Sequence, residues 1–181
     1  MYTILIVDDS PMIVDVFVTM LERGGYQPIT AFSGMECLEI LKTTTPDLVL
    51  LDIMMEPMDG WETLEKIKAD PATREISVLM LTAKPLTPEE ANTYGAYIED
   101  YILKPTTHHQ LYEAIEHVLA RQHSIAADIA RAREAGVDQR IIDEYERLSK
   151  SVDINKRLLK ILETTYSIKD VQAGMGENIT R

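Results

Sequence analysis

The chain has 181 residues, a formal net charge of −12 and a single cysteine, Cys37. This length allows one domain of ordinary size with an appendage, and a single cysteine excludes a disulfide framework. No apolar stretch reaches the length of a membrane-spanning helix, and the first residues lack the pattern of a signal peptide. We therefore expect a soluble cytoplasmic protein that does not bind membranes, with Cys37 packed on a helix in the core.

The negative charge belongs to one part of the sequence. Residues 123–181 contain ten acidic and ten basic side chains, so the whole net charge lies in residues 1–122, with twenty acidic and eight basic side chains. Neither part has the concentration of basic residues that binding to a phosphate backbone requires. We therefore do not expect direct binding to nucleic acid.

Segments of strand character alternate five times with segments of helical period. The expected strands are short apolar runs at residues 2–7, 48–51, 78–81 and 101–103, with a weaker one around Ile29. The expected helices begin near Ser10-Pro11, Ser33-Gly34, Trp61, Pro88 and Thr106-Thr107. Continuous apolar runs are typical of strands buried on both faces, and their alternation with helices predicts a doubly wound α/β domain with a parallel sheet.

The helical period does not stop where the α/β domain should end. Apolar positions recur from Leu111 to Ile129, which predicts that the fifth helix runs to about Ala135, with Gly136 as its stop and Asp138 as the N-cap of another helix. That helix has a heptad pattern: Ile141, Tyr145, Leu148, Val152, Asn155, Leu159, Leu162 and Tyr166. We therefore divide the chain into an α/β domain at 1–122, a helical hairpin at 123–170 and a loose tail at 171–181.

The heptad pattern has two interpretations. The hairpin either covers its own apolar side within one chain, or it forms a coiled coil with a second molecule, because a heptad seam does not identify the helix that it faces. The short connection at Gly136 favours antiparallel neighbours in one chain. Two helices alone bury little apolar surface, so we predict a homodimer of four helices in which Asn155 favours one register.

Polar residues end or follow four of the expected strands. They are Asp8 with Asp9, Asp52, Thr82 and Lys104. The carboxyl ends of parallel strands open on one crevice, so these side chains should converge. Clustered carboxylates suit Mg²⁺, an aspartate can accept a phosphoryl group, and a lysine and a hydroxyl can contact phosphate oxygens. Asp8-Asp9 alone would fit an acidic pair at a helix N-terminus, but the full set predicts a phosphoryl site.

These residues stand in segments that resemble the receiver domain of two-component response regulators. The resemblance covers about residues 1–122. It rests on Asp8-Asp9, on the segment from Asp52 to Gly60, on Thr82-Ala83 and on the segment from Tyr101 to Pro105. It implies a flavodoxin-like sheet with strand order 2-1-3-4-5, and a phosphoacceptor that assists its own phosphorylation and dephosphorylation without being an enzyme on other substrates.

The resemblance also implies a role for each site residue. Asp52 would accept the phosphoryl group from a sensor histidine kinase. Asp9, Asp52 and the backbone carbonyl of Met54 would bind Mg²⁺ directly, and Asp8 through water. Lys104 would contact phosphoryl oxygens beside a cis Lys104–Pro105 peptide. Thr82 would swing towards the phosphoryl group and Tyr101 would turn inward, which would remodel the face made by the fourth helix, the fifth strand and the fifth helix.

The sequence departs from the family pattern near the site. Glu56 stands where the family usually has proline, and Pro57 follows it, so an additional acidic side chain should alter phosphorylation or dephosphorylation rates. Thr106 replaces the aromatic residue that often follows the Lys-Pro pair. Trp61 is expected to pack or to lie at the surface, without a cofactor role.

We therefore expect a response regulator that signals through contacts with an unknown downstream protein. Two alternatives stay open: a DNA-binding transcriptional regulator, and a phosphate sink that needs no partner for the hairpin. An enzymatic output such as a diguanylate cyclase or a methylesterase does not fit, because fewer than sixty residues follow the α/β domain and they contain no glycine-rich or nucleophile motif.

Overall fold

The computed structural model describes residues 1–146, 148, 149 and 159. Strands and helices alternate along the chain, as the sequence predicts. The elements are β1 (Thr3–Val7), α1 (Pro11–Arg23), β2 (Gln27–Ala31), α2 (Gly34–Leu41), β3 (Leu48–Asp52), α3 (Gly60–Ala69), β4 (Val78–Thr82), α4 (Pro88–Tyr94), β5 (Asp100–Leu103) and α5 (His108–Glu134).

Side-chain caps define where most of the helices begin. In α2, α3, α4 and α5 the N-cap side chain accepts a hydrogen bond from the backbone N–H three residues later; these N-caps are Ser33, Asp59, Thr87 and Thr107. The cap of α1 differs, because Ser10 makes no side-chain cap bond and Pro11 occupies the first turn. Caps satisfy N–H groups that have no partner inside a helix, so these residues fix the helix starts locally.

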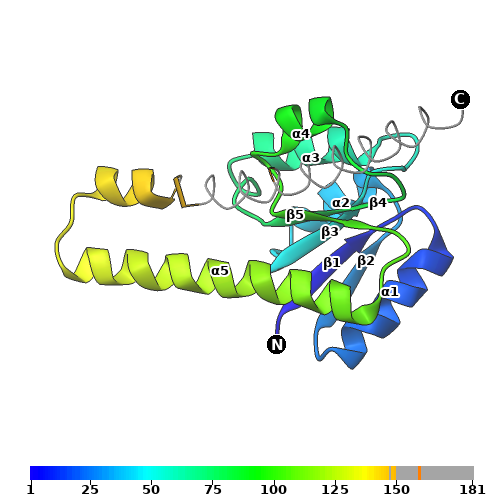
Figure 1. Ribbon diagram of the computed structural model, residues 1–181, viewed down its shortest axis with the longest axis horizontal. Helices are drawn as coiled ribbons and strands as arrows, with labels where there is room; N and C mark the ends of the chain where they lie inside the picture. Colours follow the sequence, from blue (N-terminus) through cyan, green and yellow to red (C-terminus); the bar gives the residue numbers. More distant parts are fainter. Residues whose placement is uncertain (147, 150–158, 160–181) are drawn as a thin grey trace, which may run out of the picture.

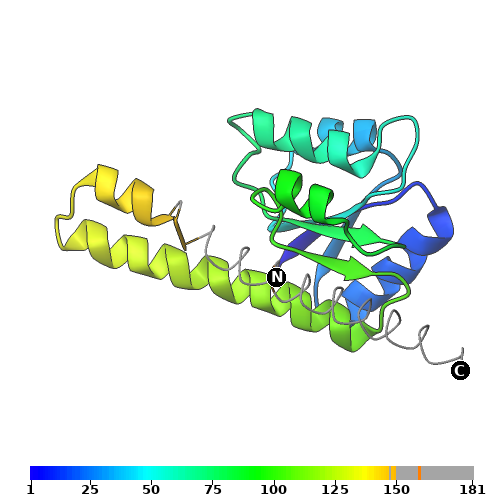
Figure 2. The same cartoon turned by 45° about the horizontal axis from the view of Figure 1, so that its top comes forward.

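The five strands form one parallel sheet in the order β2-β1-β3-β4-β5, which confirms the predicted topology. Helices cover both faces, as Figures 1 and 2 show. One apolar cluster joins the sheet to α2 and α3 and contains Cys37, which is fully buried as predicted. The other joins it to α1 and α5. Burial on both faces explains why the strand sequences are continuous apolar runs instead of alternating ones.

Helix α5 extends well beyond the sheet (Figure 1). Its 27 residues pass through the predicted domain boundary at residue 122 without interruption. At that point it contacts residues near the amino ends of the strands. The Gln122 Nε2 donates to Ser77 Oγ at 2.6 Å. Arg121 forms an ion pair with Glu99, and these two side chains are each 11% exposed. The start of the extension is therefore bonded to the residues that precede β4 and β5.

The chain turns back after α5 at the predicted residues. Gly136 has a φ of 73°, a left-handed conformation that favours glycine, and the Asp138 side chain accepts from the Arg140 backbone N–H at 2.9 Å. The next helical segment begins at residue 139 and runs back beside α5 (Figures 1 and 2). The Tyr145 hydroxyl donates to Asp128 Oδ2 of α5 at 2.6 Å, which supports an antiparallel arrangement.

The first predicted heptad position, Ile141, is not buried by α5 within the chain, so a seam with a second molecule stays a prediction. Ile142 is the buried residue, at 3% exposure, whereas Ile141 is 63% exposed. Tyr145, Leu148 and Leu159 are between 42% and 58% exposed. The other heptad positions (Val152, Asn155, Leu162 and Tyr166) and the predicted tail lie outside the described residues. Among the helices that are described, none is both long and apolar enough to cross a membrane.

Candidate functional site

The predicted site residues lie together at the carboxyl edge of the sheet. Asp8 follows β1, Asp52 ends β3, Thr82 ends β4 and Lys104 follows β5. The loop after β3 returns very close to its strand, because a Cβ on Gly60 would lie 2.1 Å from the backbone oxygen of Asp52. Only glycine fits there, so Gly60 positions the start of α3 against the site.

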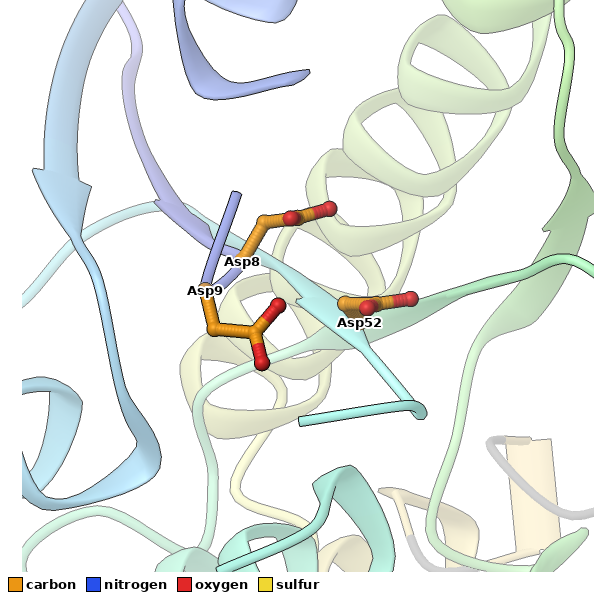
Figure 3. Close-up of side chains that lie close together, drawn as sticks. All are labelled: Asp8, Asp9 and Asp52. Atoms are coloured by element: carbon orange, nitrogen blue, oxygen red, sulfur yellow. The ribbon is translucent and has the colours of Figure 1, made fainter. Parts of the chain in front are cut away.

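Three carboxylates form a cluster in this crevice (Figure 3). One oxygen from each of Asp8, Asp9 and Asp52 lies within 4.8 Å of the others. Asp8 and Asp52 are 1% and 5% exposed, whereas Asp9 is exposed and accepts a hydrogen bond from the Glu56 backbone N–H at 3.3 Å. Mg²⁺ prefers a few carboxylates together with water and substrate phosphate, so one open and two buried carboxylates fit this ion.

Lys104 neutralises part of this negative charge. Its ammonium lies 2.5 Å from Asp8 Oδ2 and 2.9 Å from Asp52 Oδ1, and its side chain is 18% exposed. The Lys104–Pro105 peptide is cis, as the resemblance predicts, and the Glu56–Pro57 peptide is also cis. Lys104 therefore stands between two carboxylates from different strands, where it can also contact oxygens of a group bound to Asp52.

The electrostatic surroundings of Asp52 disfavour its charged form. Burial raises the pKa of the Asp52 carboxyl above its ordinary value, and the nearby charge of Asp8 adds to the rise. The ion pair with Lys104 and a hydrogen bond from the Met54 backbone N–H act in the opposite direction without cancelling the rise. A buried carboxylate with a raised pKa beside a positive charge is a functional-site candidate on physical grounds.

The two predicted switch residues have defined contacts. The Thr82 hydroxyl donates to the Lys84 backbone oxygen at 2.8 Å and accepts from the Lys84 N–H at 3.2 Å, so it faces the loop after β4. Tyr101 is partly buried and packs against the core cluster on the α2–α3 side. The Met54 side chain is 59% exposed, and its predicted role as a carbonyl ligand stays a prediction.

Sequence reasoning missed the residues that support the site. The bonds from Glu56 to Asp9 and from Lys84 to Thr82 come from backbone groups, which leave no signature in side-chain identity. Lys104 pairs with Asp8 as well as with Asp52, and this double pairing depends on how close the carboxyl ends of β1, β3 and β5 lie to one another. These contacts appear only when the sheet is assembled.

Two family models match the chain. The response regulator receiver domain matches residues 4–116. A second model, described as Metanogen output domain 2, matches residues 121–181, a region that our sequence reasoning left without a family. Together they cover most of the chain, and the gap between them falls inside α5.

Several known regulatory proteins are similar in sequence to the chain. The chain is 30% identical over 141 residues to the DNA-binding dual master transcriptional regulator RpaA of Synechocystis, covering 78% of this chain and 56% of that protein. It spans about half to two thirds of the length of this and several other transcriptional regulators.

Solved structures agree with the fold. The N-terminal domain of a response regulator receiver protein from Methanoculleus marisnigri is 88% identical, with a TM-score of 0.57, covering 66% of this chain and 98% of that one. The receiver domain of the sensor histidine kinase PA1611 from Pseudomonas aeruginosa is 25% identical, with a TM-score of 0.61, and the match covers 66% of this chain and 98% of that one. That structure holds a magnesium ion in its active-site cleft.

Proposed function

The chain belongs to the response regulator receiver family, and from this premise we propose that it accepts a phosphoryl group from a sensor histidine kinase on Asp52. The observation that supports this most is the position of the Lys104 ammonium, 2.5 Å from Asp8 and 2.9 Å from Asp52, beside a cluster of three carboxylates. The three carboxylates would hold Mg²⁺, and this cation together with the Lys104 ammonium would neutralise charge on an incoming phosphate, which is the main requirement of phosphoryl transfer.

The proposed reaction transfers one group between two side chains. A carboxylate oxygen of Asp52 attacks the phosphorus of a phosphohistidine, the P–O bond forms, the P–N bond breaks, and the histidine nitrogen keeps the electron pair. Mg²⁺, held by Asp9, Asp52 and the Met54 carbonyl with Asp8 through water, would neutralise charge on the phosphoryl oxygens. Lys104 keeps its contact with Asp8 and binds one phosphoryl oxygen.

The phosphoryl group also provides a signal. It adds acceptor oxygens at the strand ends, where the Thr82 hydroxyl is the donor at the end of β4. We propose that Thr82 leaves Lys84 for a phosphoryl oxygen and that Tyr101 moves further inward, so that the α4–β5–α5 face changes. Water then hydrolyses the acyl phosphate with the help of the same residues, and the exposed Glu56 modifies that rate.

The proposed output is contact with another protein in the cytoplasm, through a homodimer of the C-terminal helices. Ile141, Tyr145 and Leu148 are 63%, 42% and 47% exposed, although the sequence places them in an apolar heptad. A coiled-coil seam needs a partner helix to bury such side chains. DNA binding is the alternative suggested by the similarity to RpaA, and the equal numbers of acidic and basic residues after residue 122 argue against it.

Phosphorylation of the full chain tests the proposal. Incubation with acetyl phosphate and Mg²⁺ should add one phosphoryl group, detected by intact-protein mass spectrometry, and Asp52→Asn should remain unlabelled. Asp59→Asn is a matched control, because Asp59 caps α3 outside the carboxylate cluster and should leave labelling intact. Labelling of Asp52→Asn, or none of the unsubstituted chain, would refute the assignment.

A further inference from the structure

Trp61 joins two helices on one side of the sheet. Its ring, 8% exposed, stacks on Tyr94 of α4, with ring centroids 4.3 Å apart and 7° between the planes. Its indole N–H donates to Glu90 Oε1 of α4 at 3.3 Å. The Tyr94 hydroxyl donates to Glu65 Oε1 of α3 at 3.2 Å. We call these four side chains the Trp61 cluster, and they connect α3 to α4.

Helix α4 depends on such contacts for its position. It has seven residues, which is too short for a helix to be stable by itself. Ala91 is its buried aliphatic residue, and Tyr94 is only partly buried. Its capping box at Thr87 and Glu90 fixes the first turn but does not attach the helix to the rest of the domain. The Trp61 cluster supplies that attachment on the α3 side.

Lys84 links the Trp61 cluster to the phosphoryl site. Its backbone oxygen and N–H both bond to the Thr82 hydroxyl, and its ammonium lies 3.8 Å from Glu90 Oε1. A threonine hydroxyl has one proton to donate. When Thr82 donates that proton to a phosphoryl oxygen, the Lys84 oxygen loses its partner and the loop between β4 and α4 is released at its first turn.

We propose that the Trp61 cluster stabilises α4 in the unphosphorylated arrangement and that phosphorylation of Asp52 breaks it, with Trp61 and Glu90 as positioning residues. The inference rests on the proposed function, because it requires a phosphoryl group within reach of Thr82. The bonds made by Trp61 then favour the unphosphorylated state. By thermodynamic linkage, weakening them increases the affinity of the site for a phosphoryl group or its mimic.

Fluorescence provides the first test, because Trp61 is the single tryptophan of the chain. The full chain is titrated with beryllofluoride and Mg²⁺, a mimic of a phosphoryl group on a carboxylate, and ¹⁹F NMR measures the bound fraction. Emission should shift to the red as binding proceeds, because the ring leaves its stacked position and meets water. Asp52→Asn should show neither bound fluoride nor a shift.

Two substitutions provide the second test. Glu90→Gln keeps an acceptor for the Thr87 N–H but loses the charge facing Lys84 and the carboxylate facing Trp61. Trp61→Phe keeps a ring against Tyr94 and loses the N–H. Each should bind beryllofluoride about three to ten times more tightly by ¹⁹F NMR, about the effect of one hydrogen bond. Glu89→Gln, at the neighbouring exposed position, should stay within about twofold of the unsubstituted chain on the same scale.

The results separate the two proposals. If the unsubstituted chain binds no beryllofluoride, the proposed function and this inference both fail. Bound beryllofluoride without a change in Trp61 emission, or with unchanged or weaker affinity in both Glu90→Gln and Trp61→Phe, overturns the role of the Trp61 cluster and leaves phosphorylation of Asp52 intact.

Discussion

Lys104→Met tests how much the ion pairs at the strand ends contribute to folding. The substitution removes the ammonium that lies 2.5 Å from Asp8 and 2.9 Å from Asp52, while the methionine side chain keeps a similar length. The two carboxylate side chains are 2% and 7% exposed, so solvent screens them poorly. Loss of one partner from a buried ion pair costs about 3–5 kcal/mol, because the remaining charge stays buried without compensation.

A loss of this size is large for a domain whose total stability is typically about 5–15 kcal/mol. Urea unfolding followed by circular dichroism in EDTA measures it. Mg²⁺ should then recover more free energy of unfolding in Lys104→Met than in the unsubstituted chain, since the cation meets carboxylates that no ammonium has neutralised. The variant is therefore expected to be strongly Mg²⁺-dependent in its folding.

Lys66→Met is the matched control. Lys66 pairs with Glu62 at 3.3 Å on the surface of α3, where both side chains are about half exposed, so its loss should cost about 0.5 kcal/mol or less. If Lys104→Met in EDTA costs no more than Lys66→Met, the ion pairs at the strand ends do not stabilise the fold. Equal recovery by Mg²⁺ in Lys104→Met and the unsubstituted chain would contradict charge neutralisation by Lys104.

Three further predictions concern pH, the metal and assembly. Asp52→Asn should be more stable than the unsubstituted chain at neutral pH in EDTA, because burial raises the folded pKa of Asp52 above its ordinary value of 3.8. Urea unfolding at several pH values measures this gain in free energy of unfolding. The gain should be absent below pH 3.8, grow as the pH rises to the folded pKa of Asp52, and stay constant above it. Labelling by acetyl phosphate should cease in EDTA and fall further in Asp9→Ala than in Asp8→Ala, since Asp9 is the proposed direct ligand; equal losses would contradict that assignment. Light scattering should give a dimeric mass for the full chain. Leu148→Glu, which places a charge at a side chain that is 47% exposed, should give a monomeric mass, whereas the control Glu134→Gln should stay dimeric. A monomeric mass for the unsubstituted chain would exclude the dimer.

The site was predictable from the sequence because the fold leaves little freedom at the strand ends. A polar residue that ends a strand of a parallel sheet must lie at the edge where all the strands end, so Asp8, Asp52, Thr82 and Lys104 are placed once the strands are recognised. The ends of a helix are also predictable, because they are set by residues close by in the sequence. The cap at Thr107 and the glycine at residue 136 fix both ends of α5, and both act within one turn of the helix.

Contacts that depend on how elements rotate against one another were not predictable. A heptad spacing identifies an apolar side of a helix but not the side that meets α5, so Ile142 and not Ile141 is buried. The connection at residues 135–138 sets that rotation. Similarly, Trp61 was expected only to pack or to lie at the surface. Its partners Tyr94 and Glu90 come from another helix about thirty residues later.

The arrangement of contacts around the sheet separates a movable part from a fixed part. At the carboxyl edge, α4 is connected to Thr82 through Lys84, and a phosphoryl group competes directly for the Thr82 hydroxyl. At the amino edge, α5 bonds to the residues before β4 and β5 through Gln122 and Arg121, far along the strands from that competition. We therefore expect phosphorylation to displace α4 relative to α5 while α5 keeps its orientation to the sheet.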